Sequence, residues 1–216
     1  MTEKLTALLS TSYLGPVQYY SKLIHYPEIL IEQHENFPKQ TYRNRCQILA
    51  GNGVLTLSIP VDKGPDLKIK TKDVRIAYAE DWQRIHWRTI VSAYNNSPFF
   101  PFYEDEFAPF YEEKRWKYLL DFNLELQEKV LELLGIDTEI KLSSDFQSEQ
   151  QTGVVDYRDV IHPKKQKQQP DAHFDPVPYT QVFENKFDFL PNLSIIDLLF
   201  NEGPESATVL EECFQE

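Results

Sequence analysis

The first 32 residues show a strand, a helix and a second strand, and this pattern limits the possible folds more than any other feature. Leu5–Ser10 is a short apolar run, and Gly15-Pro16 separates it from a helical segment at 17–26. Proline suits the first turn of a helix, and Pro27 ends this helix before a second apolar run at 28–32. Strands joined in this way lie parallel, with a right-handed crossover. The sequence therefore predicts an α/β fold with an N-terminal βαβ unit in a mostly parallel sheet.

Ligands of parallel sheets bind beyond the carboxyl ends of the strands. In this chain those ends are Ser10–Pro16 and Gln33–Lys39. The free N–H groups and the dipole at the start of the first helix favour an anion, so we expect Tyr13 and Gln18 to bind ligand. Only one glycine is present there, which is too few for a phosphate loop or a dinucleotide-binding motif.

The middle of the chain predicts an added β-hairpin region and then a helical C-terminal half. Residues 42–49 and 54–59 read as a hairpin around a Gly-Asn-Gly turn, and 68–76 alternates like a half-exposed strand. The remaining elements expected are helices at 81–94, from about 104, and at 112–134, and a return to the sheet at 140–143.

Residues 147–178 have little periodicity, several prolines and the run KKQKQQP. Segments of this length without structure of their own are usually lids or disordered. We therefore expect one domain over 1–216 with a mobile loop at 147–178 and a C-terminal docking segment at 179–216.

Composition supports a folded chain and restricts its partners. Hydrophobic residues make up 41% of the 216, enough for a core, and the formal net charge of −12 argues against general nucleic-acid or anionic-membrane binding. We find no signal-peptide cleavage pattern and no apolar run near the roughly 18 residues of a membrane span, so we expect a cytoplasmic protein. Cys46 and Cys213 fit no metal spacing or disulfide framework. We predict no metal site, and leave cofactors and oligomeric state open.

Basic residues are concentrated in one part of this acidic chain. Residues 39–88 contain ten Lys or Arg and five Asp or Glu, which makes the stretch net +5. Arg43 and Arg45 would share one face of a strand, and Arg84 and Arg88 would stack one turn apart on a helix. Four guanidinium groups could clamp a phosphate or carboxylate, or each could pair with a surface carboxylate.

Histidines and serines give weaker signals. His86 lies between Arg84 and Arg88 and is either a buried structural imidazole or a catalytic group. His34 and Glu35 could form an acid–base pair or be solvated loop residues. No serine lies in a nucleophile-elbow motif, so classical hydrolase chemistry is not predicted.

The segment PNLSIIDLLFNEGP, residues 191–204, is short, amphipathic and bounded by helix-ending residues. Ser194 and Asp197 resemble a capping box, and Gly203 suits a left-handed C-terminal cap. The segment reads either as a plain docking helix or as part of a site, in which Asp197 and Asn201 would face a ligand near the βαβ crevice.

The order of motifs resembles the WbqC-like protein family across almost the whole chain. Ser12-Tyr13-Leu14-Gly15-Pro16 opens the match, which closes with residues 179–183 and 192–204. Between them the matching residues are Phe37, Lys39, Tyr42, Asn44, Arg45, Ile48, Leu57, Ile59, Pro60, Val61, Trp82, His86, Ile90, Tyr94, Pro98, Phe99, Phe100, Leu119, Asp121 and Asn123.

The resemblance implies a bacterial protein of O-antigen or other surface-polysaccharide biosynthesis, with an acyl, aminoacyl or glycosyl transferase as the expected enzyme. Its ligand would be small and anionic or sugar-nucleotide-like. The alternative is a non-catalytic binding or assembly module that recognises a partner protein. The candidate ligand-binding residues are Tyr13, Gln18, Asn44, Arg45, Arg88, Gln181 and Asn201, and the candidate catalytic residues are His86 and Asp197.

Overall fold

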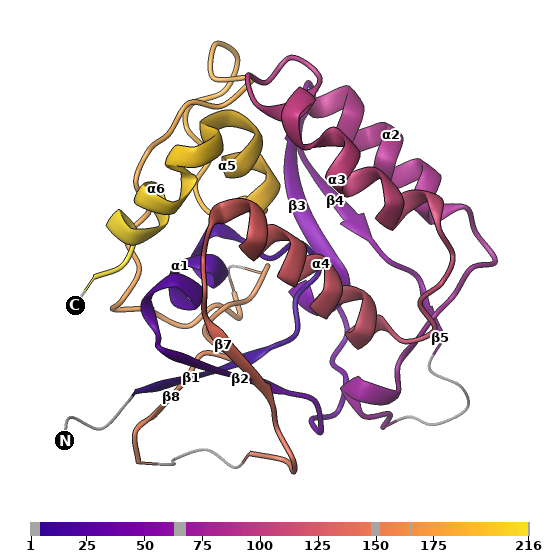
Figure 1. The fold of residues 1–216 in the computed structure, drawn as a ribbon, viewed down its shortest axis with the longest axis vertical. Helices are drawn as coiled ribbons and strands as arrows, with labels where there is room; N and C mark the ends of the chain where they lie inside the picture. The colour runs from indigo at the N-terminus through magenta and orange to yellow at the C-terminus, as the bar shows by residue number, and fades with distance from the viewer. Residues whose placement is uncertain (1–4, 63–67, 148–151, 165, 216) are drawn as a thin grey trace.

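The computed structural model describes residues 5–62, 68–147, 152–164 and 166–215, and a parallel sheet lies at its N-terminal side (Figure 1). The sheet has four strands in the order β7-β2-β1-β8, and every neighbouring pair is parallel. The predicted α/β class with a mostly parallel sheet is therefore confirmed.

The βαβ unit forms as the N-terminal pattern predicts. Strand β1 (Thr6–Ser10) is followed by helix α1 (Val17–His25) and strand β2 (Glu28–Glu32), and Leu8 pairs with Leu30 in the parallel register. Ala7, Leu8 and Leu9 of β1 and Ile29 and Ile31 of β2 are buried, because the sheet is covered by other elements, whereas Leu30 is partly exposed.

The two outer strands come from later parts of the chain. Strand β7 (Glu139–Leu142) pairs with β2, which confirms the expected return to the sheet. Strand β8 (Val154–Asp156) pairs with β1, although the segment 147–178 was predicted to be a loop. That prediction is wrong for these three residues, since so short a strand shows no periodicity. The mobility of 147–178 stays a prediction, and 148–151 and 165 lie outside the described residues.

The β-rich region contains two small antiparallel pairs. Strands β3 (Arg45–Ala50) and β4 (Gly53–Ser58) form the predicted hairpin. Strand β5 (Val61–Asp62) pairs with β6 (Arg75–Ile76). The predicted strand over 68–76 is otherwise wrong, because Thr71–Asp73 is a 3-10 turn whose main chain bonds to the loop after β2.

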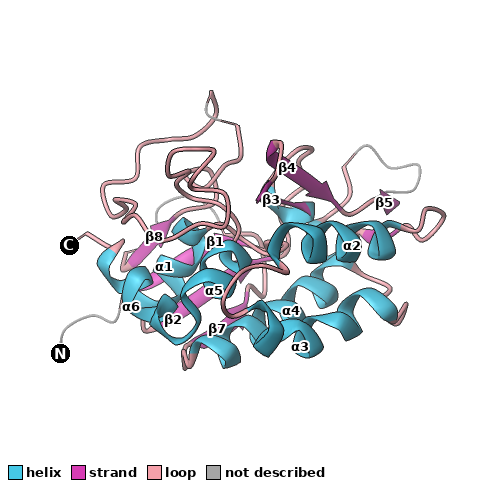
Figure 2. Ribbon diagram, turned by 90° about the horizontal axis from the view of Figure 1, so that it is seen from above, coloured by secondary structure: helices cyan, strands magenta, loops and turns pink. Residues whose placement is uncertain are grey.

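Five further helices cover the sheet and the hairpin (Figure 2). Their bounds are α2 (Trp82–Tyr94), α3 (Phe100–Glu112), α4 (Leu119–Leu134), α5 (Ile195–Glu202) and α6 (Ser206–Glu212). Helix α3 begins four residues before the expected Glu104, and α4 begins later than expected because 113–118 is not helical. The rings of Tyr94, Phe100 and Phe107 pack edge-on against Phe200, which joins α5 to α2 and α3.

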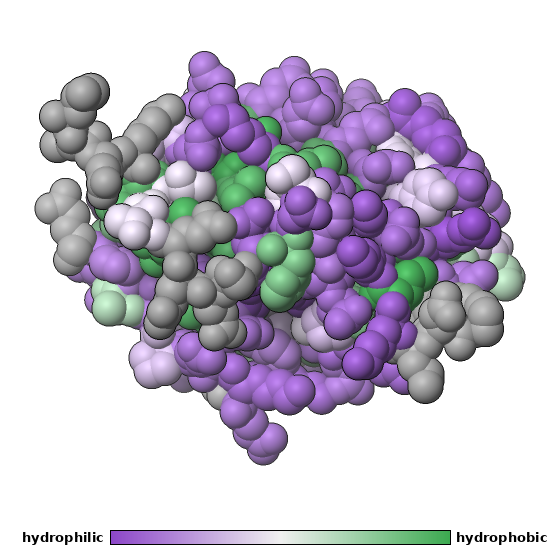
Figure 3. All heavy atoms as spheres, turned by 90° about the horizontal axis from the view of Figure 1, so that it is seen from below, coloured by the Kyte–Doolittle hydropathy of each residue, from purple (hydrophilic) through white to green (hydrophobic). Residues whose placement is uncertain are grey.

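Most of the surface seen from below is hydrophilic, with smaller apolar areas between polar ones (Figure 3). Within the described ranges, no helix is both long enough and apolar enough to cross a membrane.

Candidate functional site

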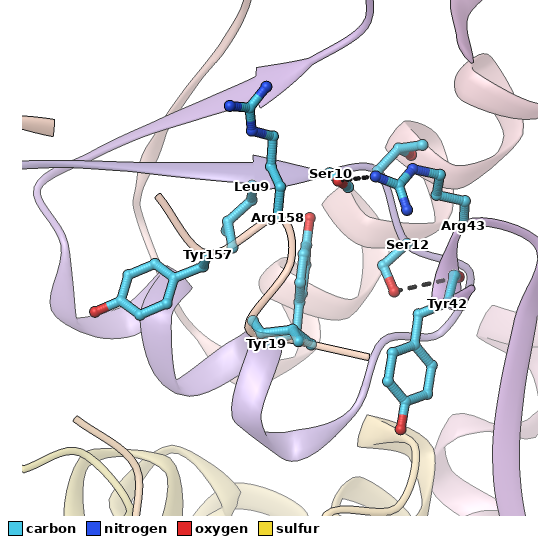
Figure 4. Close-up of a pocket in the computed structure, with 10 residues that line it drawn as sticks. Leu9, Ser10, Ser12, Tyr19, Tyr42, Arg43, Tyr157 and Arg158 are labelled. Atoms are coloured by element: carbon cyan, nitrogen blue, oxygen red, sulfur yellow. Dashed lines mark hydrogen bonds between the residues drawn. The ribbon is translucent and has the colours of Figure 1, made fainter. Parts of the chain in front are cut away.

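A small pocket lies where the parallel strands β1 and β8 end (Figure 4). Ser10, Thr11 and Ser12 continue β1 into it, and Arg158 comes two residues after β8. The full lining is Leu9, Ser10, Thr11, Ser12, Tyr19, Tyr42, Arg43, Tyr157, Arg158 and Ile161. Its place agrees with the expectation that ligands of this fold bind beyond the carboxyl ends of the strands.

Arg43 is held rigidly on one side of the pocket. It lies in a 3-10 turn just before β3, and its side chain is only 6% exposed. Its Nε and Nη2 atoms donate to the two carboxylate oxygens of Glu35, each at 2.7 Å, and Nη2 also donates to Ser10 Oγ. This two-point bond orients the planar guanidinium. Burial raises the pKa of Glu35, although the charge of Arg43 and its hydrogen bonds oppose the shift.

Arg158 occupies the other side and is held in the same way. Its Nε and Nη2 atoms donate to the carboxylate of Asp156, and its Nη1 lies 3.7 Å from Glu32. The fully buried Glu32 also accepts hydrogen bonds from the main chain of His34 and from the hydroxyl of Ser143.

Two arginines therefore face three carboxylates at this edge of the sheet. The three carboxylates do not line the pocket themselves, but they compensate the charges of both guanidinium groups that do. Such a surface matches ligand groups that both donate and accept hydrogen bonds better than it matches an isolated dianion.

The wall of the pocket continues into buried amide groups. The Tyr19 hydroxyl donates to Gln127 Oε1 at 2.8 Å, and Asn123 Nδ2 donates to Thr11 Oγ1 and to the carbonyl of Arg43. The Gln127 Nε2 and Asn123 Oδ1 atoms are buried and have no partner within the described part of the chain. These contacts fix the wall of the pocket against helix α4.

The expected anion site at the start of α1 is occupied by the protein itself. The Val17 N–H donates to the carbonyl of Leu193, and the Gln18 N–H donates to Asn192 Oδ1. The Gln18 side chain bonds to Asp171 and Asn192. The segment before α5 thus already satisfies the donors on which the predicted anion site depends, and ligand binding by Tyr13 and Gln18 stays a prediction.

Tyr13 and His86 meet in the interior. The Tyr13 hydroxyl lies 2.9 Å from His86 Nδ1 and 2.9 Å from the Tyr111 hydroxyl. His86 is 4% exposed and also hydrogen-bonds to the Ser58 backbone. Burial lowers the pKa of His86 to about 4, so the imidazole is neutral at physiological pH. This arrangement agrees with the structural interpretation of His86.

Asp197 lies at the centre of a buried cluster. Its carboxylate accepts hydrogen bonds from the Tyr94 hydroxyl at 2.8 Å, from the Tyr179 hydroxyl at 2.7 Å, and from Gln181 Nε2 at 2.9 Å. Burial raises the pKa of Asp197, and these three donors oppose the shift. Asn201, 5% exposed, donates to the Asp197 carbonyl. Both residues thus face the protein's own interior, and the bonds of the Asp197 carboxylate tie α5 to Tyr94 of α2 and to the segment of Tyr179 and Gln181.

The capping box at the start of α5 is not formed. Ser194 Oγ donates to the Leu14 carbonyl instead of capping its own helix, and the Ser194 N–H donates to Gln47. Gly203 has a positive φ of 54°, but its ψ of −123° lies outside the left-handed helical region, so the predicted left-handed cap is not formed. Because Ser194 also pairs with Pro16, helix α5 docks directly on the turn between β1 and α1.

The four arginines do not converge. Arg43 lines the pocket, whereas Arg84 pairs with Asp81 at the surface and Arg88 lines a separate groove beside Gly51. The predicted clamp of four guanidinium groups is therefore wrong. Arg43 and Arg45 do not share a strand face, because Arg43 lies in the 3-10 turn before the strand that Arg45 begins.

Asn44 and Arg45 carry unsatisfied buried atoms. Asn44 donates to the Ile59 carbonyl, while its Oδ1 is buried without a partner in the described structure. Arg45 Nε is also buried and unpartnered there, and burial lowers the pKa of Arg45. Ligand binding by Asn44, Arg45 and Arg88 stays a prediction.

Sequence reasoning missed Arg158, Tyr19 and Tyr157 as pocket residues. The one available signal was the pair Val154-Val155, since β-branched residues favour a strand and Arg158 would then follow its carboxyl end. Across the described ranges, no group of three His, Cys, Asp or Glu side chains is arranged to hold a metal ion.

Comparison with known proteins gives two matches. Residues 11–209 match the family described as the WbqC-like protein family. The chain is also 25% identical over 236 aligned positions to Rv1507c, an uncharacterized protein of Mycobacterium tuberculosis, and the alignment covers 98% of this chain and 100% of that protein. No solved structure matches significantly.

Proposed function

This chain belongs to the WbqC-like protein family, and from that premise we propose that it is a transferase of bacterial surface-polysaccharide biosynthesis or modification. It binds an anionic or nucleotide-activated ligand in the pocket at the carboxyl edge of the parallel sheet. The observation that carries the proposal is the pair of oriented guanidinium groups, Arg43 and Arg158, on the two sides of that pocket.

The two arginines are suited to binding because their orientation is set before a ligand arrives. Each guanidinium is held by a carboxylate through Nε and Nη2, so little side-chain freedom remains to be lost. The bonds to Glu35 and Ser10 come from Nε and Nη2 of Arg43. The hydroxyls of Ser10 and Ser12 add groups that both donate and accept.

A thermal-shift screen with nucleotides, nucleotide sugars and coenzyme A tests the proposal. A ligand present at a hundred times its dissociation constant should stabilise the fold by about 2.7 kcal/mol. Arg158→Lys should weaken binding of any such ligand although the charge is kept, because the planar fork is lost.

Arg84→Lys is the matched control, since Arg84 is also paired with a nearby aspartate but lies on the surface away from the pocket. Its variant should bind like the unaltered protein. The proposal is wrong if no compound of the screen stabilises the chain, or if both Lys variants bind with unchanged affinity.

A further inference from the structure

The segment that follows the pocket residue Ile161 folds back over the chain that carries Arg43. The Lys164 N–H donates to His162 Nδ1, and the Lys164 ammonium contacts Gln40 Oε1, three residues before Arg43. The Lys167 N–H donates to the Lys164 carbonyl, which closes a turn. We call residues 161–164, 166 and 167 the pocket rim.

The rim brings positive charge together. The main-chain bonds of Lys164 and Lys167 hold them close to His162 in one turn. In agreement with this, burial and the charges of Lys167, Arg43 and Lys164 lower the pKa of His162. Lys164 and Lys167 are exposed, and neither forms an ion pair with a carboxylate in the described part of the chain. Their charges are therefore available to an anion, unlike those of the two arginines inside the pocket.

The pocket and its rim thus offer two different environments. Inside, hydroxyl groups line the wall, and the charges of the two arginines are already compensated by carboxylates that lie outside the lining. A dianion placed there would therefore gain little from the two guanidinium charges, because Glu32, Glu35 and Asp156 already pair with them. Outside, at the rim, the charge is uncompensated. The pocket is small and Ile161, the first residue of the rim, is part of its lining, so a ligand larger than the pocket can extend over the rim.

We propose that the ligand is a phosphorylated sugar, with its phosphate or diphosphate bound at Lys164 and Lys167 and its sugar hydroxyls between Arg43 and Arg158. This inference rests on the proposed function and specifies the ligand class of the same pocket. Sugar hydroxyls donate and accept, and so they match paired guanidinium and carboxylate groups, while phosphate suits free ammonium groups. A sugar phosphate and a nucleoside diphosphate sugar share this chemistry.

Isothermal titration calorimetry with four probe classes tests the inference: free hexoses, inorganic pyrophosphate, hexose 1-phosphates and a panel of nucleoside diphosphate hexoses. Phosphorylated sugars should bind more tightly than pyrophosphate or free hexose alone. If hexose 1-phosphates bind more tightly than nucleoside diphosphate hexoses, the ligand is a simple sugar phosphate. If the order is reversed, the ligand is a nucleoside diphosphate sugar.

The variant Lys164→Gln/Lys167→Gln should weaken binding of phosphorylated sugars by about tenfold, because two charged contacts are lost at an exposed site. It should also flatten the dependence of affinity on salt. The control Lys114→Gln/Lys117→Gln removes the same charge from exposed lysines between α3 and α4 and should bind like the unaltered protein.

The outcomes separate this inference from the function on which it rests. If phosphorylated sugars bind, and Arg158→Lys weakens their binding while the rim variant does not, the proposed phosphate site at the rim is wrong. The proposed binding at the pocket is then still supported. If pyrophosphate binds as tightly as every phosphorylated sugar, the sugar assignment is wrong. If no probe binds, the proposed ligand class and the subsite both fail.

Discussion

Replacing His86 by asparagine should remove a large part of the pH dependence of stability. The asparagine side chain keeps an acceptor near the Nδ1 atom that meets the Tyr13 hydroxyl, and it does not titrate. The variant will lose some stability at every pH because the ring no longer packs against Trp82. The informative quantity is therefore the change with pH and not the offset.

The magnitude follows from the shift of the pKa. Burial lowers the pKa of His86 from 6.5 to about 4 in the folded protein. As the pH falls through 6.5, the unfolded chain takes up a proton that the folded protein refuses, so stability is full above 6.5 and declines down to about 4. At about 1.4 kcal/mol for each unit, the loss between pH 7.5 and 5 is about 2 kcal/mol.

Other groups titrate in this range, and some act in the opposite direction. Burial raises the pKa values of Glu35 and Asp197, so their protonation on acidification favours the folded state. The comparison must therefore be made between variants. Urea unfolding at pH 7.5, 6 and 5 should show that the His86→Asn protein loses about 2 kcal/mol less than the unaltered protein over this range.

If His86→Asn and the unaltered protein lose stability in parallel, the imidazole is not a buried neutral group, and its proposed structural role is refuted.

Three substitutions test the packing that holds the C-terminal part of the chain. Lys22→Met should lower the free energy of unfolding by about 3–5 kcal/mol in urea titrations, because it leaves Asp171 as an uncompensated, partly buried charge. Adding Asp171→Leu to this variant should recover part of the lost stability. Gly203→Ala should lower the free energy of unfolding by about 2 kcal/mol or more, because the backbone there has a φ of 54° and a Cβ would lie 2.4 Å from the Phe99 ring. An unchanged melting temperature would contradict this geometry. Ser194→Ala should cost about 1 kcal/mol through the lost bond to the Leu14 carbonyl, and calorimetry that shows no change would exclude that bond as a stabilising contact.

Local pattern was sufficient where the determining interactions lie within a few residues. The Gly15-Pro16 break and Pro27 delimit α1, and the turn at 50–53 sets the hairpin, because proline and glycine restrict the backbone wherever they occur. For the same reason the α/β class, and the carboxyl edge of the sheet as the place to look for a pocket, could be derived from the first 32 residues.

The tertiary structure alone decided which polar side chains meet. Asp197 and Gln181 looked available for a ligand, yet the hydroxyls of Tyr94, 103 residues away, and Tyr179, 18 residues away, bond to the carboxylate together with Gln181 itself. The start of α1 looked free for an anion, yet Asn192 covers it from 174 residues away.

The pocket itself shows the same limit. Arg43 was one of four interchangeable arginines in the sequence, and Arg158 lay in a segment without periodicity. Only the parallel pairing of β1 with β8 brings Arg158 to the pocket opposite Arg43. Strand pairing depends on contacts between segments more than a hundred residues apart, and periodicity within either segment carries no information about them.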